Sequence, residues 1–254
     1  MSRLRRALVL ARRELTSLLA APLGWIILAG WSLLAGDLWI AMIDRYASSS
    51  LERVYSPWAA GELDPIAHLV APWQSNLSIV LLVVGPAITM RSLAEESRRG
   101  TLELLLASPA SAAEIVVGKY LGAMAYCTLL LAWTGWMPLL IAGRVPLDAG
   151  AVLSGTVGLF AYAACVVAIG LLASASTDSP ALAMILSFAV CLVLWIAGWI
   201  DPDPTSLWTQ LSLSGHLVDA WLGLLRASDL AYVGGLVGAA LVLATLRVEA
   251  GRYL

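Results

Sequence analysis

The chain has 254 residues, of which 60% are hydrophobic and 13% are charged, and its formal net charge is −2. Soluble domains carry about 25% charged residues, so this chain has roughly half the usual complement. Disorder is excluded, because disordered chains combine low hydrophobicity with high net charge. A soluble enzyme of this size could not cover so much apolar surface, and a nearly neutral chain has no electrostatic attraction for nucleic acid. The composition predicts a membrane protein.

Six stretches of the sequence are long and apolar enough to cross a bilayer, which requires about 20 predominantly apolar residues. We therefore predict an all-α, polytopic fold in which residues 1–254 form a single transmembrane domain. The predicted spans cover residues 23–43, 70–90, 120–143, 150–174, 180–200 and 230–246. Pro180 suits the first turn of the fifth helix.

The distribution of basic residues orients these spans. Six spans place both termini on one side of the membrane. That side carries Arg3, Arg5, Arg6, Arg12, Arg13, Arg91, Arg98, Arg99, Lys119, Arg247 and Arg252, and the other side carries Arg45, Arg53, Arg144 and Arg226. Because basic residues concentrate in cytoplasmic loops, we predict a multi-pass protein of the bacterial cytoplasmic membrane with both termini in the cytoplasm.

Residues 3–20 precede the first span and have leucines at helical spacing, with most arginines away from that stripe. This pattern predicts an amphipathic helix in the membrane interface that ends near Pro22. The alternative is a frayed basic terminus. After the first span, residues 44–69 are expected to form an outer loop.

A second unusual segment, residues 201–228, follows the fifth span. The run Asp201-Pro202-Asp203-Pro204 ends that helix, and apolar residues then recur at helical spacing on both sides of Ser214-Gly215. Two short amphipathic helices with a break between them could form a re-entrant hairpin, whose backbone must be covered by protein. They could equally form a helix that lies on the outer surface.

Few residues have the side chains and spacing of a catalytic or metal-binding site. The three cysteines are isolated in apolar runs, the two histidines are far apart, and we expect no catalytic, cofactor-binding or metal site. No G-x-x-x-x-G-K-[ST] motif is present, so ATP, if it is used, must bind to another chain. Asp37 is the one ionisable residue inside a predicted span, and we expect it near the outer headgroups.

The longest inner connection, residues 90–119, has a pattern of breaks and caps. The second span is expected to continue as a charged helix with Glu95 and Arg99 at i,i+4, and Gly100 ends it. Thr101 can cap a helix of about two turns that stops before Pro109. Ser111-x-x-Glu114 forms a capping box that starts the third span helix.

The short helix between these breaks is almost entirely apolar, from Leu102 to Leu106. An apolar helix of two turns outside the membrane must be covered. It could be partly buried in the lipid interface, or it could dock into a groove of a partner protein.

The residues of this connection resemble those of a known family. Ala94-Glu95-Glu96, Gly100-Thr101-x-Glu103-Leu104-Leu105, Pro109 and Ile115-Val116-x-Gly118-Lys119 are similar to the ABC-2 type permeases, and most similar to their gliding-motility (GldF-like) subgroup and its NosY-like relatives. The resemblance implies a permease subunit, most simply of an exporter, without an ATPase of its own. It also implies re-entrant helices between spans five and six.

The resemblance further implies partners. Two permease subunits, identical or related, would pair with two cytosolic ATP-binding subunits that hold ATP and Mg²⁺. Residues 95–116 would form the coupling segment. Its expected contact residues are Glu95, Glu96, Arg98, Arg99, Gly100, Thr101, Leu102, Glu103, Leu104, Leu105, Leu106 and Pro109.

Two other classes of membrane protein compete with this hypothesis. An ion-coupled transporter needs ionisable groups at membrane depth, and only Asp37 qualifies. An intramembrane enzyme needs a set of catalytic residues facing one cavity, and the histidines lie outside the spans. An adjacent ATPase gene or co-purification with an ATPase would favour the permease.

Overall fold

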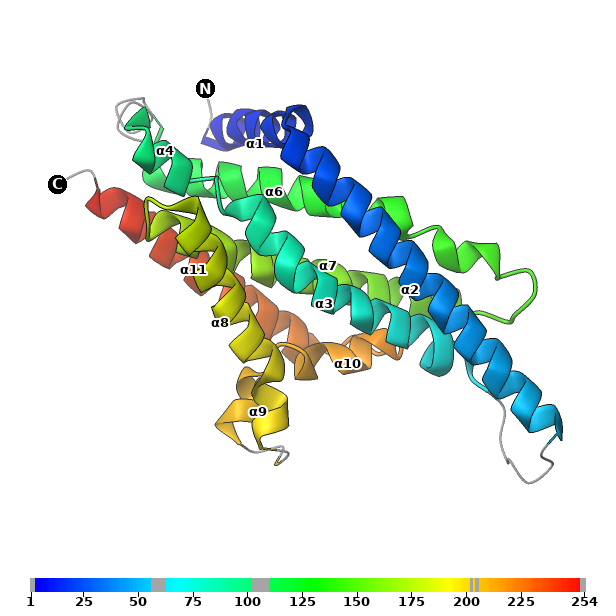
Figure 1. Ribbon diagram of the computed structural model, residues 1–254. Coiled ribbons are helices and arrows are strands. Elements are labelled where there is room, and N and C mark those ends of the chain that lie inside the picture. The colour runs from blue at the N-terminus through cyan, green and yellow to red at the C-terminus, as the bar shows by residue number, and fades with distance from the viewer. Residues whose placement is uncertain (1–2, 56–62, 102–109, 202, 204–205, 252–254) are drawn as a thin grey trace.

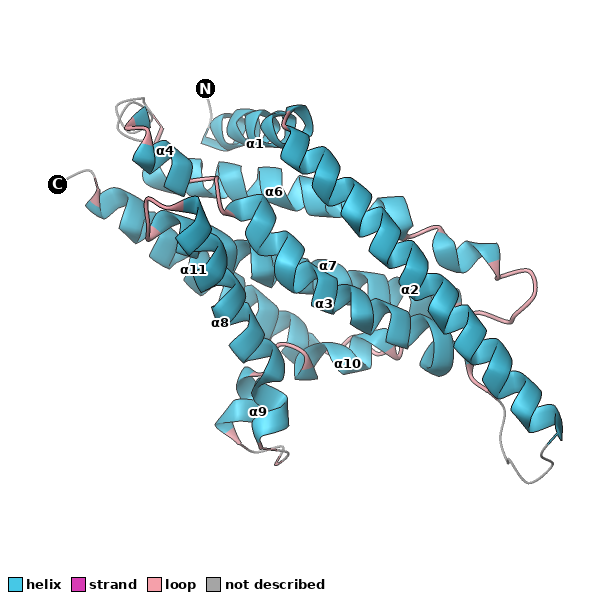
Figure 2. Cartoon of the chain, viewed as in Figure 1, coloured by secondary structure: helices cyan, strands magenta, loops and turns pink. Residues whose placement is uncertain are grey.

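The computed structural model describes residues 3–55, 63–101, 110–201, 203 and 206–251, and every regular element in these ranges is helical. Six long helices form the body of the molecule: α2 (Pro22–Tyr55), α3 (Ala71–Thr89), α6 (Ala112–Thr134), α7 (Ala149–Ala175), α8 (Pro180–Ile200) and α11 (Ala227–Ala250). Shorter helices flank them: α1 (Arg3–Ala20), the π-helix η1 (Ile66–Val70), α4 (Ala94–Arg98), the 3₁₀-helix η2 (Met137–Leu140), α9 (Leu207–Leu211) and α10 (Gly215–Trp221). Figure 2 shows short loops joining them.

The prediction of an all-α protein with six membrane-crossing helices is confirmed. The helix α2, however, continues to Tyr55, so the predicted loop is wrong for residues 44–55. No Gly or Pro follows Asp37 before Tyr55, so nothing in the sequence stops the helix. Asp37 consequently lies in the middle of α2, and its side chain is exposed.

Helix α7 occupies the centre of the bundle and packs against α3, α6, α8, α10 and α11 (Figure 1). Its sequence is rich in Ala, Gly and Ser, which allow neighbouring helix backbones to approach closely. Gly155 faces the side chain of Gln74, and Gly170 faces that of Thr89. By contrast, α8 and α11 have few buried residues and leave broad apolar faces uncovered.

The predicted amphipathic helix is present as α1, and it crosses the end of the bundle at which α11 also finishes (Figure 1). We call this the basic end, because most of the arginines lie here. The small residues Ala7 and Ala11 are buried against α6, whereas Leu4 and Leu8 are exposed. The alternative of a frayed terminus is wrong.

Two glycines of α6 make the contact with α1 possible. A Cβ at Gly118 would lie 2.6 Å from Leu10 Cβ and 3.0 Å from the Ala7 carbonyl oxygen. At Gly122 it would lie 2.6 Å from Glu14 Cβ and 2.7 Å from the Ala11 carbonyl oxygen. The contacts move four residues along α1 as they move four residues along α6. The two helices are therefore parallel over this region.

The segment after α8 folds as two short helices, α9 and α10, with a break between them. The Leu213 N–H donates to the Leu194 carbonyl at 2.9 Å, and the Ser214 hydroxyl donates to the Trp195 carbonyl at 2.7 Å. Leu194 lies six residues before Ile200, the last residue of α8. At a helical rise of about 1.5 Å per residue, the chain therefore runs back along α8 for about 9 Å. This geometry favours the re-entrant hairpin over a surface helix, since Leu213 is fully buried.

Side chains hold this hairpin to α7 and α11. Ser154 donates to the Ala220 carbonyl at 2.9 Å. The two ring nitrogens of His216 lie 2.8 Å from Asp229 Oδ1 and 3.0 Å from the Gln210 carbonyl oxygen. The ring also stacks on Tyr232, with centroids 4.1 Å apart. His216 thus joins α9, α10 and α11 at the far end of the bundle.

We expect Gly122→Ala to destabilise the protein by about 1–3 kcal/mol, as overpacking does, because its Cβ meets the backbone of α1. The matched control is Gly30→Ala in α2, where a Cβ would meet nothing within 4 Å. Thermal unfolding of both variants in detergent measures the difference. Equal melting temperatures would show that the α1–α6 contact is loose.

Candidate functional site

The candidate site is the connection between α3 and α6 at the basic end, together with the residues that hold it. Helix α3 ends at Thr89, the chain turns through residues 90–93, and α4 follows. The predicted charged helix and its Glu95–Arg99 pair are present, but the helix is not continuous with α3 as predicted. The Ser174 hydroxyl of α7 explains the break, because it accepts the N–H groups of Leu93 and Ala94, each at 3.0 Å, and donates to the Met90 carbonyl at 3.3 Å.

Beyond α4, the predicted sharp stop at Gly100 is confirmed, since this residue has φ +67°. Few residues other than glycine adopt that conformation. The Thr101 hydroxyl donates back to the Glu96 carbonyl at 3.2 Å. The next part of the predicted coupling segment lies outside the described residues: Leu102, Glu103, Leu104, Leu105, Leu106 and Pro109.

The predicted capping box at the start of α6 is confirmed. The Glu114 N–H donates to the Ser111 hydroxyl at 3.2 Å, and the Ser111 N–H donates to the Glu114 carboxylate at 3.1 Å. The same carboxylate lies 2.8 Å from the guanidinium of Arg6. The start of α6 is thus fixed both by its own cap and by α1.

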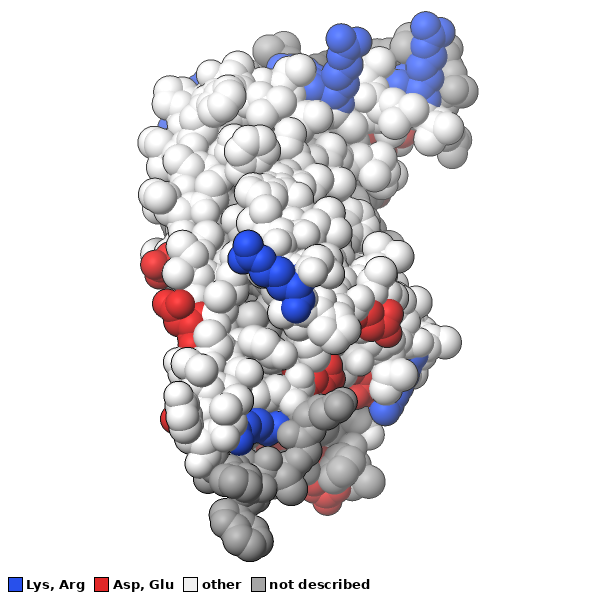
Figure 3. Space-filling model, turned by 90° about the vertical axis from the view of Figure 1, so that its right-hand side faces the viewer, with Lys and Arg blue, Asp and Glu red and all other residues white. Residues whose placement is uncertain are grey.

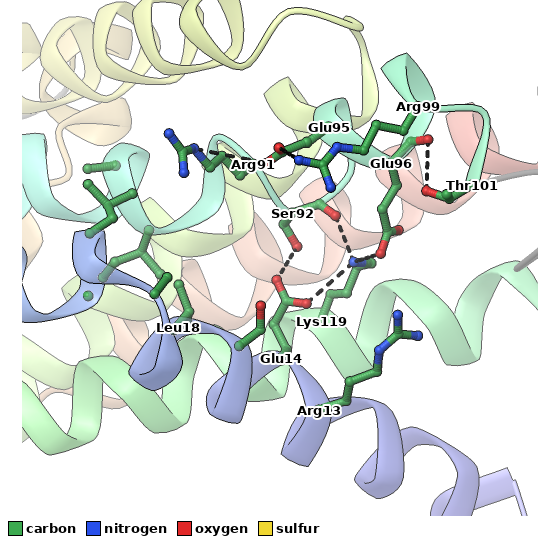
Figure 4. A pocket seen from close by; sticks show the side chains of 16 residues that line it. Arg13, Glu14, Leu18, Arg91, Ser92, Glu95, Glu96, Arg99, Thr101 and Lys119 are labelled. Carbon is green, nitrogen blue, oxygen red and sulfur yellow. Dashed lines mark hydrogen bonds and ion pairs between the residues drawn. The ribbon is translucent and has the colours of Figure 1, made fainter.

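A buried ammonium group joins three helices at the root of the connection (Figure 4). The side chain of Lys119 is 5% exposed, and its Nζ lies 2.9 Å from Glu96 Oε1 and 3.4 Å from Glu14 Oε2. Lys119 also donates to the Ser92 carbonyl at 2.6 Å, and the Ser92 hydroxyl donates to Glu14 at 2.8 Å. This cluster, which we call the Lys119 anchor, ties α1 and α4 to α6.

Sequence reasoning missed the Lys119 anchor, because it used Lys119 for the orientation of the protein and for the family resemblance but assigned it no partner. The distribution of charges in the sequence could have indicated this pair. Lys119 is the one basic residue in the helix that runs from Ala112 to Thr134, and Glu14 is the one acidic residue of α1. An isolated charge inside an apolar helix requires a partner, since burying an uncompensated ion is costly.

The other charged side chains of α4 have distinct roles. Glu95 pairs with Arg99 and, at 3.9 Å, with Arg91. The Ser97 hydroxyl donates to Asp178 in the turn between α7 and α8. Arg98 is exposed and has no partner among the described residues. Of the predicted contact residues, Glu96 is therefore turned inward to Lys119, while Arg98 and Arg99 face outward.

This arrangement is suited to transmitting movement. The connection between α3 and α6 contacts α1, α7 and the α7–α8 turn through charged or hydroxyl groups. Among the described residues, no three His, Cys, Asp or Glu side chains gather as they would around a metal ion.

We expect Lys119→Met to destabilise the fold by about 3–5 kcal/mol, because it leaves Glu14 and Glu96 without their cation. Arg98→Gln also removes one positive charge, but from an exposed side chain, and should cost less than about 1 kcal/mol. Thermal unfolding in detergent compares the two. Similar small effects would mean that the Lys119 anchor contributes little to stability.

Comparison with known proteins identifies the family of the chain. The family model described as ABC-2 family transporter protein matches residues 18–202, which is more than half of the chain. The match extends from the end of α1 to the end of α8 and includes all described residues of the α3–α6 connection. No curated protein matches the chain significantly. The chain belongs to the ABC-2 family of transporter proteins.

Proposed function

We propose that the chain is the permease subunit of an ABC exporter and is driven by a separate cytosolic ATPase. Membership of the family makes it a membrane-embedded transport component that generally works with an ATP-binding subunit. The observation that carries the proposal further is the anchored α3–α6 connection at the basic end. We also propose that the chain belongs to the gliding-motility (GldF-like) subgroup, and this assignment rests on the sequence resemblance alone.

The orientation of the protein follows from its basic end. Arg3, Arg5, Arg6, Arg12 and Arg13 lie in α1, and Arg91, Arg98 and Arg99 lie around α4. In Figure 3 basic side chains project from one end of the surface, and a band without charged side chains separates them from those lower down. The positive-inside rule supports a cytoplasmic position for this end in a bacterial inner membrane.

ATP and Mg²⁺ would be held by the partner, because the chain contains no phosphate-binding loop of its own. The apolar run from Leu102 to Leu106 would dock into a groove of the ATPase, and Arg98 and Arg99 would face acidic groups around it. Movement of the docked segment would reach α7 through Ser174, the α7–α8 turn through Asp178, and α1 and α6 through the Lys119 anchor.

A second permease subunit would complete the pathway. Helices α8 and α11 leave much of their apolar surface uncovered within one chain. An added Cβ at Gly234 or Gly238 of α11 would meet nothing within 4 Å among the described residues, so these glycines face away from the described part of the bundle. Such a small-residue face permits the close approach of another transmembrane helix.

We expect Leu105→Ala to weaken assembly with the ATPase by at least an order of magnitude, because truncating a buried leucine costs about 2–5 kcal/mol. Charge reversal at Glu103 should also reduce co-purification or separate ATP hydrolysis from transport. Leu225→Ala, on the far side of the membrane in the proposed orientation, is the control. Full assembly and full coupled activity in both coupling variants would refute the role of this segment.

We expect native mass spectrometry of the intact complex to show two permease subunits with two ATPase subunits. The physical reason is that six helices enclose little space unless a second set faces them. A complex that contains one permease with its ATPase would contradict the pairing and would leave the assignment of the family untouched.

A further inference from the structure

A cavity of about 360 Å³ lies at the basic end between the α1–α2 elbow, the end of α3, and α4 (Figure 4). Its lining divides into a charged part and an apolar part. The charged and hydroxyl side chains are Arg13, Glu14, Ser17, Arg91, Ser92, Glu95, Glu96, Arg99, Thr101 and Lys119. The apolar part comes from Leu18, Ala21, Leu23, Gly24, Ala87 and Ile88. The cavity is therefore amphiphilic.

The position of the apolar part relates the cavity to the bilayer. Leu23 and Gly24 belong to the first turn of α2, and Ala87 and Ile88 belong to the last turn of α3. Both helices cross the membrane from this end. In a bilayer crossed by these helices, the apolar part would be at the level where the acyl chains of the adjacent leaflet begin, and the charged part would be at the level of the headgroups.

The charges around the cavity do not cancel. Lys119 with Glu14 and Glu96 carries a net charge of −1, whereas Glu95 with Arg91 and Arg99 carries +1. Arg13 is exposed and lines the cavity, and its guanidinium has no partner among the described residues. With four basic and three acidic side chains in the lining, one positive charge remains, which matches a phosphate diester.

One polar atom in the lining also needs a donor. Glu96 Oε2 is buried and accepts no hydrogen bond within the described structure, although its other oxygen contacts Lys119. A buried acceptor without a partner is destabilising, so a bound group with a hydroxyl or ammonium donor would be favoured here. A choline headgroup has no such donor.

We propose that this cavity binds an anionic phospholipid from the leaflet at the basic end, with phosphatidylglycerol as the best-matched headgroup. Its phosphate lies among Arg13, Arg91 and Arg99, its glycerol hydroxyl reaches Glu96, and its acyl chains start against Leu18 and Ile88. The site joins the α1–α2 elbow to α4. The proposal requires a membrane domain and holds whether or not an ATPase binds.

Short-chain lipids test the site on the purified chain in detergent, with native mass spectrometry to count bound molecules. Dihexanoyl phosphatidylglycerol should bind, and dihexanoyl phosphatidylcholine should bind more weakly. Arg13→Gln should weaken binding about fivefold, because a basic residue near an anionic headgroup contributes about that factor. Arg12→Gln is the matched control: it removes the same charge from the neighbouring, exposed position outside the cavity.

A second comparison separates a lipid from a free phosphate ester. Ala21→Trp fills the apolar part and should abolish phosphatidylglycerol binding, and Ala87→Leu serves if the first variant is unstable. Glycerol 3-phosphate, which has no acyl chains, should not bind measurably. Equal binding of the two lipids, equal losses in Arg13→Gln and Arg12→Gln, or binding of glycerol 3-phosphate as strong as that of the lipid would each overturn the proposal.

Discussion

The architecture of the basic end depends on one buried ammonium group. Lys119 is almost inaccessible to solvent, and removal of such a charge from water is compensated only where opposite charges and hydrogen bonds surround it. Glu14 from α1, Glu96 from α4 and the carbonyl of Ser92 provide that compensation. Because these groups come from separate segments, satisfying one charge determines how α1, α4 and α6 are placed relative to one another.

Close helix packing makes this ionic cluster possible. Gly118 and Gly122 let α1 approach α6 until Ala7 and Ala11 are in contact with its backbone, and Glu14 then reaches Lys119. In a membrane, such contacts between small residues are a main source of helix association, since lipid offers no hydrophobic drive between helices. Packing and electrostatics therefore act on the same pair of helices.

At both ends of the bundle, the non-helical backbone is hydrogen-bonded to a neighbouring long helix. At the basic end, the Ser174 hydroxyl accepts the N–H groups of the turn before α4. At the far end, Leu213 and Ser214 bond to carbonyls of α8, so the hairpin backbone is covered by protein. Non-helical backbone at membrane depth is tolerated only where protein covers it or where it lines a water-filled cavity. The central helix α7 supplies the hydrogen-bond partners for the α3–α6 connection, and its neighbour α8 supplies them for the hairpin.

Much of this protein could be predicted without coordinates. Apolar runs predicted six helices, Gly100 and the Ser111–Glu114 box predicted two boundaries that depend on local chemistry, and residues 91–119 indicated the family. Local signals could not reveal the break at residues 90–93, because a hydroxyl distant in sequence, that of Ser174, creates it. Nor could they show that Glu96 turns inward to Lys119 or that a cavity opens beside Arg13. Those features arise from side chains far apart along the chain, so only the tertiary structure decided them, whereas periodicity and capping are properties of neighbouring residues that the sequence by itself determined.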